Sequence, residues 1–193
     1  AAAVLVVPSA SNFKSVQELV TQAKGKPAYL TAGNSGTGTL AHLAAELFEV
    51  ETGVALTPVP YRGESALMPD LISGQVSLGF LNLPSVAPHI KSGKLKALAV
   101  SAPQPVKDFS AVPTFRSLGY PSLEVQGWAA LLAPKGSIPE EGLARLEGLL
   151  HKALGSDVVQ ARFASLNVEP VFQSRQGTGQ FLLSEGARYA QVI

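Results

Sequence analysis

Apolar positions along about the first hundred residues fall into two alternating patterns. Short runs of β-branched and other apolar residues, bounded by Gly, Pro or polar residues, predict buried strands. Between these runs, apolar residues recur every three or four positions, which predicts helices with one buried face. The expected strands are 4–7, 29–32, 55–60, 76–82 and 95–101, and the expected helices are 15–24, 40–52, 65–73 and 83–92.

Strand and helix alternate four times before residue 101, which is typical of a parallel sheet with right-handed crossover helices. Ligands of such sheets bind beyond the carboxyl ends of the strands. The turns at 33–39, 61–63 and 82–85 each follow a predicted strand. We therefore expect these three turns to meet at one edge of the sheet.

The second half of the chain is less regular. Three prolines and the lack of any period mark 102–113 as a surface loop. The helix at 138–154 has the clearest apolar stripe of the chain. The other predicted elements are a helical turn at 115–119, an extended run at 123–133, a helix at 157–166, a strand at 168–172 and a helix at 180–193.

The turn from Gly33 to Thr39 is rich in glycine and hydroxyl side chains and leads directly into a predicted helix. The first N–H groups of a helix lack intrahelical partners and lie at the positive end of its dipole, so they favour an oxyanion. Glycine also allows a ligand to approach the backbone closely. The turn therefore indicates a cradle for a carboxylate or phosphate. The alternative is an ordinary polar turn in which Thr37 or Thr39 caps the helix.

Three further side chains are candidates at the same edge. Arg62 has the planar fork that binds two carboxylate oxygens, and a solvated surface arginine is the alternative. Tyr61 lies beside it in the strand-to-helix turn and is a candidate ligand contact. His42, one helical turn after the glycines, either contacts the ligand or packs behind the turn.

Composition narrows the possible functions. Charged residues are 15% of the 193, apolar residues are 46% and the formal net charge is +1, with no basic cluster, so nucleic acid is not an expected partner. The lack of cysteine excludes disulfides, zinc–thiolate sites and thiol catalysis. With three scattered histidines, we also expect no transition metal. The longest apolar run, Ala1–Val7, is too short to span a bilayer.

Three longer stretches carry a family resemblance. They are VPYRG at 59–63, GQVSLGFLNLPSVAPHIKSGKLKALAVS at 74–101 and VPTFRSLGYPSLEVQGWAALLAPKG at 112–136. Their order and spacing resemble the Bug family, the periplasmic solute-binding receptors of tripartite tricarboxylate transporters. The resemblance covers nearly the whole chain. It implies a type II periplasmic-binding-protein-like α/β fold, in which two lobes hold a small organic carboxylate.

The resemblance also implies where the ligand binds. The family's glycine- and serine-rich loop corresponds to 33–39, its tyrosine–basic–glycine turn to 61–63 and its phenylalanine–acid–asparagine segment to 80–82. At the acidic position this chain has Leu81, which cannot accept a hydrogen bond from a ligand amine or hydroxyl, so an apolar or aromatic carboxylate is favoured over an amino acid. The candidate ligand-binding residues are Gly33, Asn34, Ser35, Gly36, Thr37, Gly38, Thr39, His42, Tyr61, Arg62, Asn82 and Ser85.

Compared with the family, the chain is expected to hold one complete lobe and part of another. The resemblance assigns 1–6 to a crossing strand, 7–125 to the complete lobe, and 126–193 to the second crossing strand and the returning part of the first lobe. The resemblance implies that the family's N-terminal half-lobe and a signal peptide lie outside this sequence. Apolar stripes on the predicted helices 143–154 and 181–192 then lack a covering sheet, so we expect partner chains or self-association through this region.

Three classes of function remain. The leading interpretation is a periplasmic receptor that captures a small organic carboxylate for membrane transporter subunits, or for a membrane sensor, without enzyme activity, metal or organic cofactor. A hydrolase using Ser35 or Ser85 with His42 or His89 is disfavoured, because the chain has no G-x-S-x-G elbow and no acidic residue evidently placed to orient a histidine. The third class is a truncated receptor remnant or interaction module that binds no ligand.

Overall fold

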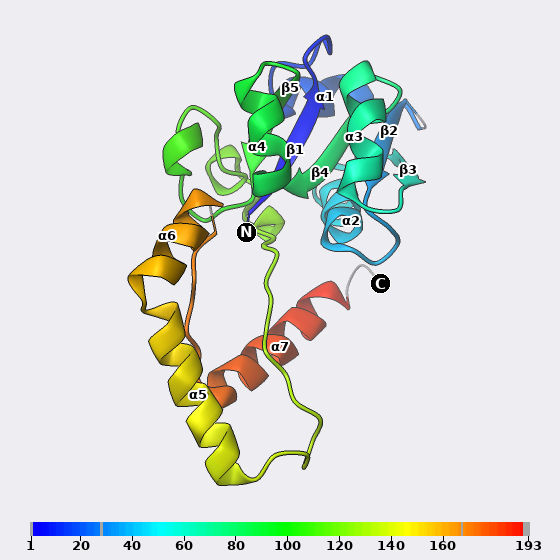
Figure 1. The fold of residues 1–193 in the computed structure, drawn as a ribbon. Helices are drawn as coiled ribbons and strands as arrows, with labels where there is room; N and C mark the ends of the chain where they lie inside the picture. The colour runs from blue at the N-terminus through cyan, green and yellow to red at the C-terminus, as the bar shows by residue number, and fades with distance from the viewer. Residues whose placement is uncertain (1, 28, 167, 191–193) are drawn as a thin grey trace. The chain divides into compact units, whose positions relative to one another are not determined.

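The computed structural model describes residues 2–27, 29–166 and 168–190. The chain divides into two compact units, 1–127 and 128–193, called unit 1 and unit 2 from here on. Unit 1 combines a sheet with helices, whereas the regular elements described in unit 2 are all helices (Figure 1).

Unit 1 is built on a five-stranded sheet. In spatial order, its strands are β3 (Leu56–Pro60), β2 (Leu30–Asn34), β4 (Leu78–Asn82), β1 (Ala3–Pro8) and β5 (Leu95–Val100). The predicted α/β class is confirmed, and the parallel pairing expected from the strand–helix repeat holds for β2 with β3 and β4. β1 is the exception, because it lies between β4 and β5 and runs antiparallel to both. The sheet is therefore mixed.

The four helices of unit 1 begin and end close to the predicted positions. They are α1 (Val16–Ala23), α2 (Leu40–Thr52), α3 (Glu64–Ser73) and α4 (Leu83–Lys91). The side chain of Ser15 caps α1 by accepting the Glu18 N–H at 3.1 Å. Gly53 and Gly74, both left-handed, end α2 and α3. Capping residues and apolar period together thus define these helices.

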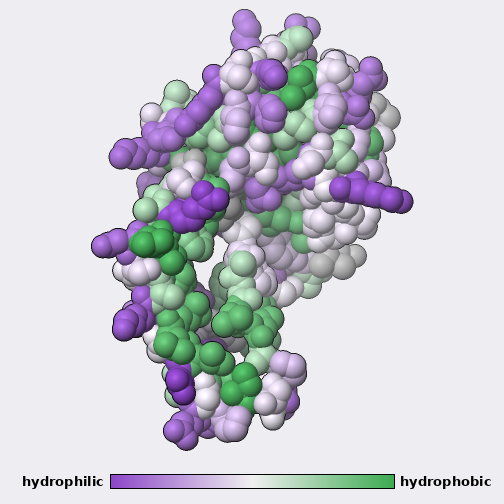
Figure 2. All heavy atoms as spheres, in the orientation of Figure 1, coloured by the Kyte–Doolittle hydropathy of each residue, from purple (hydrophilic) through white to green (hydrophobic). Residues whose placement is uncertain are grey.

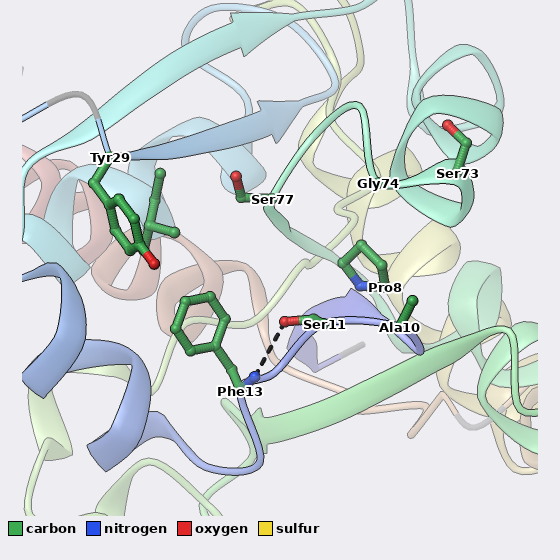
Figure 3. Close-up of a pocket in the computed structure, with 9 residues that line it drawn as sticks. Pro8, Ala10, Ser11, Phe13, Tyr29, Ser73, Gly74 and Ser77 are labelled. Atoms are coloured by element: carbon green, nitrogen blue, oxygen red, sulfur yellow. Dashed lines mark hydrogen bonds between the residues drawn. The ribbon is translucent and has the colours of Figure 1, made fainter.

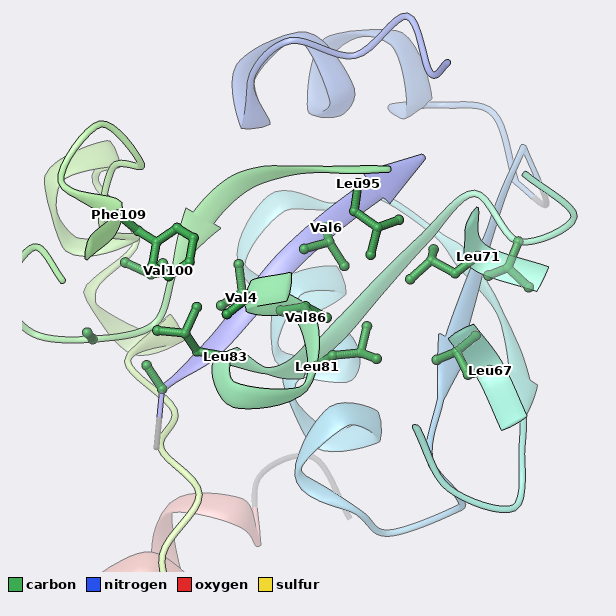
Figure 4. Packing of buried hydrophobic residues seen from close by; sticks show 14 residues of the cluster. Val4, Val6, Leu67, Leu71, Leu81, Leu83, Val86, Leu95, Val100 and Phe109 are labelled. Atoms are coloured by element: carbon green, nitrogen blue, oxygen red, sulfur yellow. The ribbon is translucent and has the colours of Figure 1, made fainter. Parts of the chain in front are cut away.

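The core of unit 1 lies on both faces of the sheet. All six residues of β1 are buried, as expected for a central strand. Val4 and Leu81 pack with α3 and α4 on one face (Figure 4). Because side chains alternate along a strand, Phe80 points to the other face, where its ring centroid lies 5.7 Å from that of Phe48 and 6.1 Å from that of Phe115. The sheet is therefore a buried middle layer.

Short helical turns complete unit 1 after β5. They are η1 (Lys107–Phe109), η2 (Arg116–Leu118) and η3 (Pro121–Leu123), and η2 confirms the helical turn expected at 115–119. The extended run expected at 123–133 forms no regular strand within the described residues. It makes a single bridge, between Gln126 and Ala2. A strand needs a paired neighbouring strand along its length, and this bridge is the one strand pairing of the segment among the described residues.

Unit 2 contains α5 (Glu140–Leu154), α6 (Asp157–Ser165) and α7 (Arg175–Tyr189). The strand predicted at 168–172 is wrong, because this segment is irregular and no neighbouring strand pairs with it in the described structure. α7 begins earlier than expected, because Ser174 caps it by accepting the Gly177 N–H at 3.1 Å. Residues 191–193 of the predicted last helix lie outside the described residues.

The apolar stripes of unit 2 are largely exposed. Leu146 and Leu149 of α5 are 41% and 55% exposed, and Leu183 of α7 is 76% exposed. No residue of α5 is buried, and Figure 2 shows hydrophobic side chains on the surface over this helix. Within the described ranges, no helix has the length and apolar character needed to cross a membrane.

Candidate functional site

The candidate ligand-binding turns leave the same edge of the sheet. β2 lies between β3 and β4 and runs parallel to both, so their carboxyl ends are neighbours. At this edge Asn34 pairs in register with Pro60. The turn 33–39 leads from β2 into α2, the turn 61–63 leads from β3 into α3, and 82–85 joins β4 to α4.

The turn after β2 is held by its own side chains. Asn34 is 2% exposed, and its Oδ1 accepts the Gly36 N–H at 3.0 Å. Thr39 Oγ1 donates to the Gly36 carbonyl at 2.7 Å and accepts from Ser35 Oγ at 3.2 Å. The hydroxyl of Thr39 therefore closes the turn and does not cap an N–H of α2. This network fixes the shape of the backbone before any ligand arrives.

Of the four backbone N–H groups from Gly36 to Thr39, three already have acceptors within the protein. The Gly36 N–H bonds to Asn34, the Gly38 N–H donates to His42 Nδ1 at 3.3 Å, and the Thr39 N–H bonds to the Gly36 carbonyl at 3.3 Å. These three N–H groups are therefore paired within the turn and the start of α2. The turn is short enough for its own acceptors to reach them.

The available backbone donors lie inside the turn at Thr37 and just after it, at the start of α2. The N–H groups of Thr37 and of the first turn of α2, at 40–42, make no hydrogen bond within the described structure. These first-turn groups are the orphan donors of a helix start, at the positive end of α2. His42 helps to hold them, because its Nδ1 accepts from the turn and its Nε2 lies 3.5 Å from Glu46 Oε1.

Two glycines of the turn are required by its backbone, and a third by packing. Gly36 and Gly38 have φ of 128° and 76°, which side-chain-bearing residues rarely adopt. Gly33 is buried, and a Cβ there would lie 2.3 Å from Leu67 Cδ1. The small size of Gly33 therefore lets α3 pack against β2. Gly33 thus serves the packing of the core and does not face a ligand.

Tyr61 joins the turn after β3 to both neighbours. Its N–H donates to the Asn34 carbonyl at 2.9 Å, and its hydroxyl donates to Asp70 Oδ2 at 2.7 Å. This hydrogen bond to a carboxylate, together with partial burial, raises the pKa of the Tyr61 phenol. The ring thus faces back to α3, and Tyr61 positions the backbone of the turn.

The remaining candidates differ in how they are held. Arg62 is exposed and makes no hydrogen bond or ion pair among the described residues. Asn82 is tied to Glu64, whose Oε1 accepts from its backbone N–H at 3.0 Å and from its Nδ2 at 2.9 Å. Ser85 is exposed on α4, without a hydrogen bond in the described structure. The edge therefore gathers the turn 33–39, Tyr61 and Asn82, and leaves the Arg62 guanidinium unpaired.

Sequence reasoning missed Glu64 and Asp70. Both are acids on α3 that hold a candidate residue, Asn82 in one case and Tyr61 in the other. An acidic residue is common in the first turn of a helix, because it interacts favourably with the helix dipole. Nothing in the sequence therefore indicated that Glu64 also binds Asn82. Asp70 follows Tyr61 by nine positions, and no short spacing rule links the two.

A hollow of about 340 Å³ lies at the opposite edge of unit 1 (Figure 3). It lies where β1 ends at Pro8 and where β2 and β4 begin, because β1 runs against its neighbours. Its wall includes Phe13, Tyr29 and three serines, and it has no charged side chain. Its lining residues therefore supply no cation to pair with a carboxylate. Within the described residues, no three His, Asp or Glu side chains group to hold a metal ion.

The chain belongs to the family of tripartite tricarboxylate transporter receptors. The profile described as "Tripartite tricarboxylate transporter family receptor" matches residues 1–193. Among relatives, protein BugT of Bordetella pertussis is 35% identical over 190 residues, which are 98% of this chain and 58% of that protein. The family resemblance of the sequence is thereby confirmed.

Solved structures agree with this membership. Rpa4515 of R. palustris, solved with adipate, has a TM-score of 0.88 and 32% identity over 99% of this chain and 64% of that chain. MatC (Rpa3494) of Rhodopseudomonas palustris, with bound malate, has a TM-score of 0.87 and 25% identity over 99% of this chain and 66% of that chain. The chain thus spans a little over half the length of BugT and about two thirds of each solved protein.

Proposed function

We propose that the protein is an extracytoplasmic solute-binding receptor that captures a small organic carboxylate for a tripartite tricarboxylate transporter. The observation that carries the proposal is the carboxyl edge of unit 1. At this edge, the first N–H groups of α2 and the Arg62 guanidinium both lack partners in the described structure. The turns that carry them are joined by the hydrogen bond from the Tyr61 N–H to the Asn34 carbonyl. Family membership and the adipate and malate bound to two similar proteins support a carboxylate.

An oxyanion at this edge meets two kinds of donor. The N–H groups at 40–42 combine hydrogen bonding with the positive end of the α2 dipole. Arg62 can bind two carboxylate oxygens with its planar guanidinium. Each charge-assisted hydrogen bond of this kind contributes about 1.5–3 kcal/mol. The Thr37 N–H lies next to these donors along the chain, while Asn34 and Tyr61 hold the backbone in place.

A receptor fits the side-chain pairing better than a hydrolase. The Ser35 hydroxyl donates to Thr39, and His42 accepts from the Gly38 N–H, so these two residues are turned to other partners. Ser85 makes no hydrogen bond to a histidine within the described residues. A nucleophilic serine needs a base within hydrogen-bond reach. We therefore propose binding without catalysis, and without a metal or organic cofactor.

Family membership also supports a proposal about location and partners. We propose a periplasmic location, with the membrane subunits of the transporter as partners. Within the chain, we assign 1–6 to a crossing strand, 7–125 to a complete lobe, and 126–193 to the second crossing strand and the returning part of the other lobe. The family profile over the whole chain supports this assignment.

The test is titration calorimetry of the natural full-length protein with dicarboxylates, tricarboxylates and aromatic acids. Gly36→Val should weaken binding at least about tenfold, because a φ of 128° is rarely adopted by residues with a side chain, so the substitution distorts the turn. Ser35→Ala should have a smaller effect, because it removes one hydroxyl. Gly25→Val, with a φ of 76° and no nearby atom, is the matched control for strain.

Two outcomes contradict the proposal. If no acid of the panel binds, the chain is not a carboxylate receptor. If an acid binds and Gly36→Val leaves its affinity unchanged, the turn 33–39 is only structural and the site lies elsewhere. The melting temperature of each variant shows whether it remains folded.

A second candidate function is an interaction module. The observation that favours it is the exposure of Leu146, Leu149 and Leu183 on the helices of unit 2. An apolar face of this kind on a monomer is rare and is usually covered by a partner. Light scattering of this chain over a range of concentrations tests self-association, which Leu149→Glu should abolish. A monomer at every concentration contradicts it.

A further inference from the structure

Glu64 links the turn after β3 to the end of β4. It follows Gly63 directly and is the first residue of α3. Its Oε1 accepts both N–H groups of Asn82, the backbone one at 3.0 Å and Nδ2 at 2.9 Å. Because β2 lies between β3 and β4, this pair spans the end of β2, next to the turn that opens α2. A negative charge therefore sits at the candidate edge.

The pairing decides which end of the Asn82 amide remains available. A carboxylate only accepts hydrogen bonds, so the NH2 group of Asn82 must face Glu64. Asn82 Oδ1 and Glu64 Oε2 then make no hydrogen bond within the described structure. Neither oxygen is fully buried, so a ligand can reach both. Both are acceptors. The edge thus presents acceptors at Glu64 and Asn82, and donors at α2 and Arg62.

We propose that Glu64 determines the ligand class, selecting a carboxylate that also carries a hydrogen-bond donor, a hydroxyl or a protonated amine. This inference rests on the proposed function, since it concerns the same ligand. The carboxylate binds to the donors of α2 and Arg62, and the hydroxyl or amine donates to Glu64 and Asn82. A simple dicarboxylate leaves these acceptors unpaired and is repelled by the charge of Glu64.

The position of Leu81 supports this reasoning. Its side chain is 1% exposed and packs in the core with Leu67 and Leu71, so its apolar surface does not reach the edge. The expectation of an apolar or aromatic carboxylate, which rested on Leu81, therefore loses its structural reason. Glu64, from the neighbouring turn, supplies the acidic acceptor beside Asn82.

A purely structural role for Glu64 is the alternative. An acid in the first turn of a helix is stabilised by the helix dipole with or without a ligand, and its bonds to Asn82 hold α3 to β4. That role predicts a lower melting temperature when Glu64 is changed. It predicts no change in the ratio of affinities for ligands that differ only in a donor group, so this ratio separates the two roles.

Succinate, malate and aspartate are a matched series, because they differ only in a hydrogen, a hydroxyl or an amine at one carbon. The natural full-length protein should bind aspartate and malate at least about tenfold more tightly than succinate in titration calorimetry, as expected for an added hydrogen bond to a charged group. Glu64→Gln keeps an acceptor for Asn82 but removes the charge. It should reduce the preference for aspartate over succinate about tenfold. Glu51→Gln, exposed near the end of α2, is the control and should leave the preference unchanged.

The outcomes separate this inference from the proposed function. If succinate or adipate binds as tightly as aspartate and malate, the receptor function stands and the role of Glu64 is wrong. A preference that Glu64→Gln leaves unchanged also overturns the role of Glu64. If no carboxylate binds, the proposed function fails and this inference fails with it.

Discussion

The two units of this chain have the same kind of apolar periodicity but opposite burial. In unit 1, β1 is entirely buried and the aromatic rings of Phe48, Phe80 and Phe115 pack together on one face of the sheet. In unit 2, Tyr189 is the one buried residue among those described. The periodic leucines of α5 remain partly or largely exposed. An apolar stripe therefore predicts a helix, but it does not predict that the chain itself covers the stripe.

Polar and aromatic contacts hold unit 2 together in place of a core. Arg175, at the start of α7, pairs with Glu140 and Glu147 of α5. The Trp128 ring meets Phe181 edge-on, with centroids 5.4 Å apart, and its Nε1 lies 3.3 Å from a Glu185 carboxyl oxygen. Exposed ion pairs contribute little to stability. Unit 2 should therefore be much less stable than unit 1 unless another surface covers it.

The largest expected effect is the loss of Phe80 from the core of unit 1. Phe80→Ala should lower the free energy of unfolding of unit 1 by about 3–5 kcal/mol, because it leaves a cavity between Phe48 and Phe115. Leu149→Ala in unit 2, at a side chain that is 55% exposed, is the counterpart and should cost less than about 1 kcal/mol. Urea unfolding followed by circular dichroism measures both.

Trp128 makes it possible to follow unit 2 separately in these experiments. It is the only tryptophan of the sequence and lies in unit 2, so its fluorescence reports that unit. Equal losses in the two variants would contradict the comparison, because they would mean that Leu149 is as well packed as Phe80.

The sequence predicted most of unit 1 because its signals are local. Ser15, Gly53 and Gly74 mark helix ends, and the apolar period marks the buried faces. The direction of β1 was not predictable, because its apolar run is compatible with either parallel or antiparallel neighbours. The strand expected at 168–172 failed for a related reason. A β-rich segment forms a strand only where a neighbour supplies hydrogen bonds, and local sequence does not specify that neighbour.

The candidate site was predicted at the level of turns but not of individual bonds. The turn 33–39 and Tyr61 adjoin at the expected edge. Which donors remain free depends on side chains that fold back, such as Asn34 onto Gly36 and His42 onto Gly38. Glu64 reaches Asn82 across 18 positions of sequence. Such contacts arise from the packing of α3 on the sheet, which the spacing of residues does not encode.

Replacing one glycine by alanine in each unit should change the stability of the protein in opposite directions. Gly33→Ala in unit 1 places a Cβ 2.3 Å from Leu67 Cδ1 and 3.1 Å from Val76 Cγ1, so overpacking should destabilise the protein by about 1–3 kcal/mol. Gly148→Ala in α5 of unit 2 meets no atom within 4 Å and should stabilise the helix by about 0.5–1 kcal/mol. Urea unfolding measures both, and destabilisation by Gly148→Ala would mean that α5 is covered.

The smallest expected effect is a pH dependence of opposite sign in the two units. In unit 2, the hydrogen bond and charge of Arg175 lower the pKa of Glu140. Its stabilising effect is therefore present above the usual glutamate pKa and is lost as the pH falls through the lowered value. In unit 1, burial raises the pKa of Glu49, although the Leu56 N–H donates to its carboxylate. The contribution of protonated Glu49 to the stability of unit 1 is therefore present at low pH and is lost as the pH rises through the raised pKa.

Glutamine variants measured near pH 7 and in acid below the lowered pKa of Glu140, which is also below the usual glutamate pKa of about 4.3, test these signs. Glu140→Gln should loosen unit 2 near pH 7, seen as an earlier change of Trp128 fluorescence in urea, and should change little at the lower pH. Glu49→Gln should raise the stability of unit 1 near pH 7 in circular dichroism and should also change little at the lower pH. If both variants shift stability in the same direction near pH 7, burial and pairing do not distinguish the two carboxyl groups as the structure indicates.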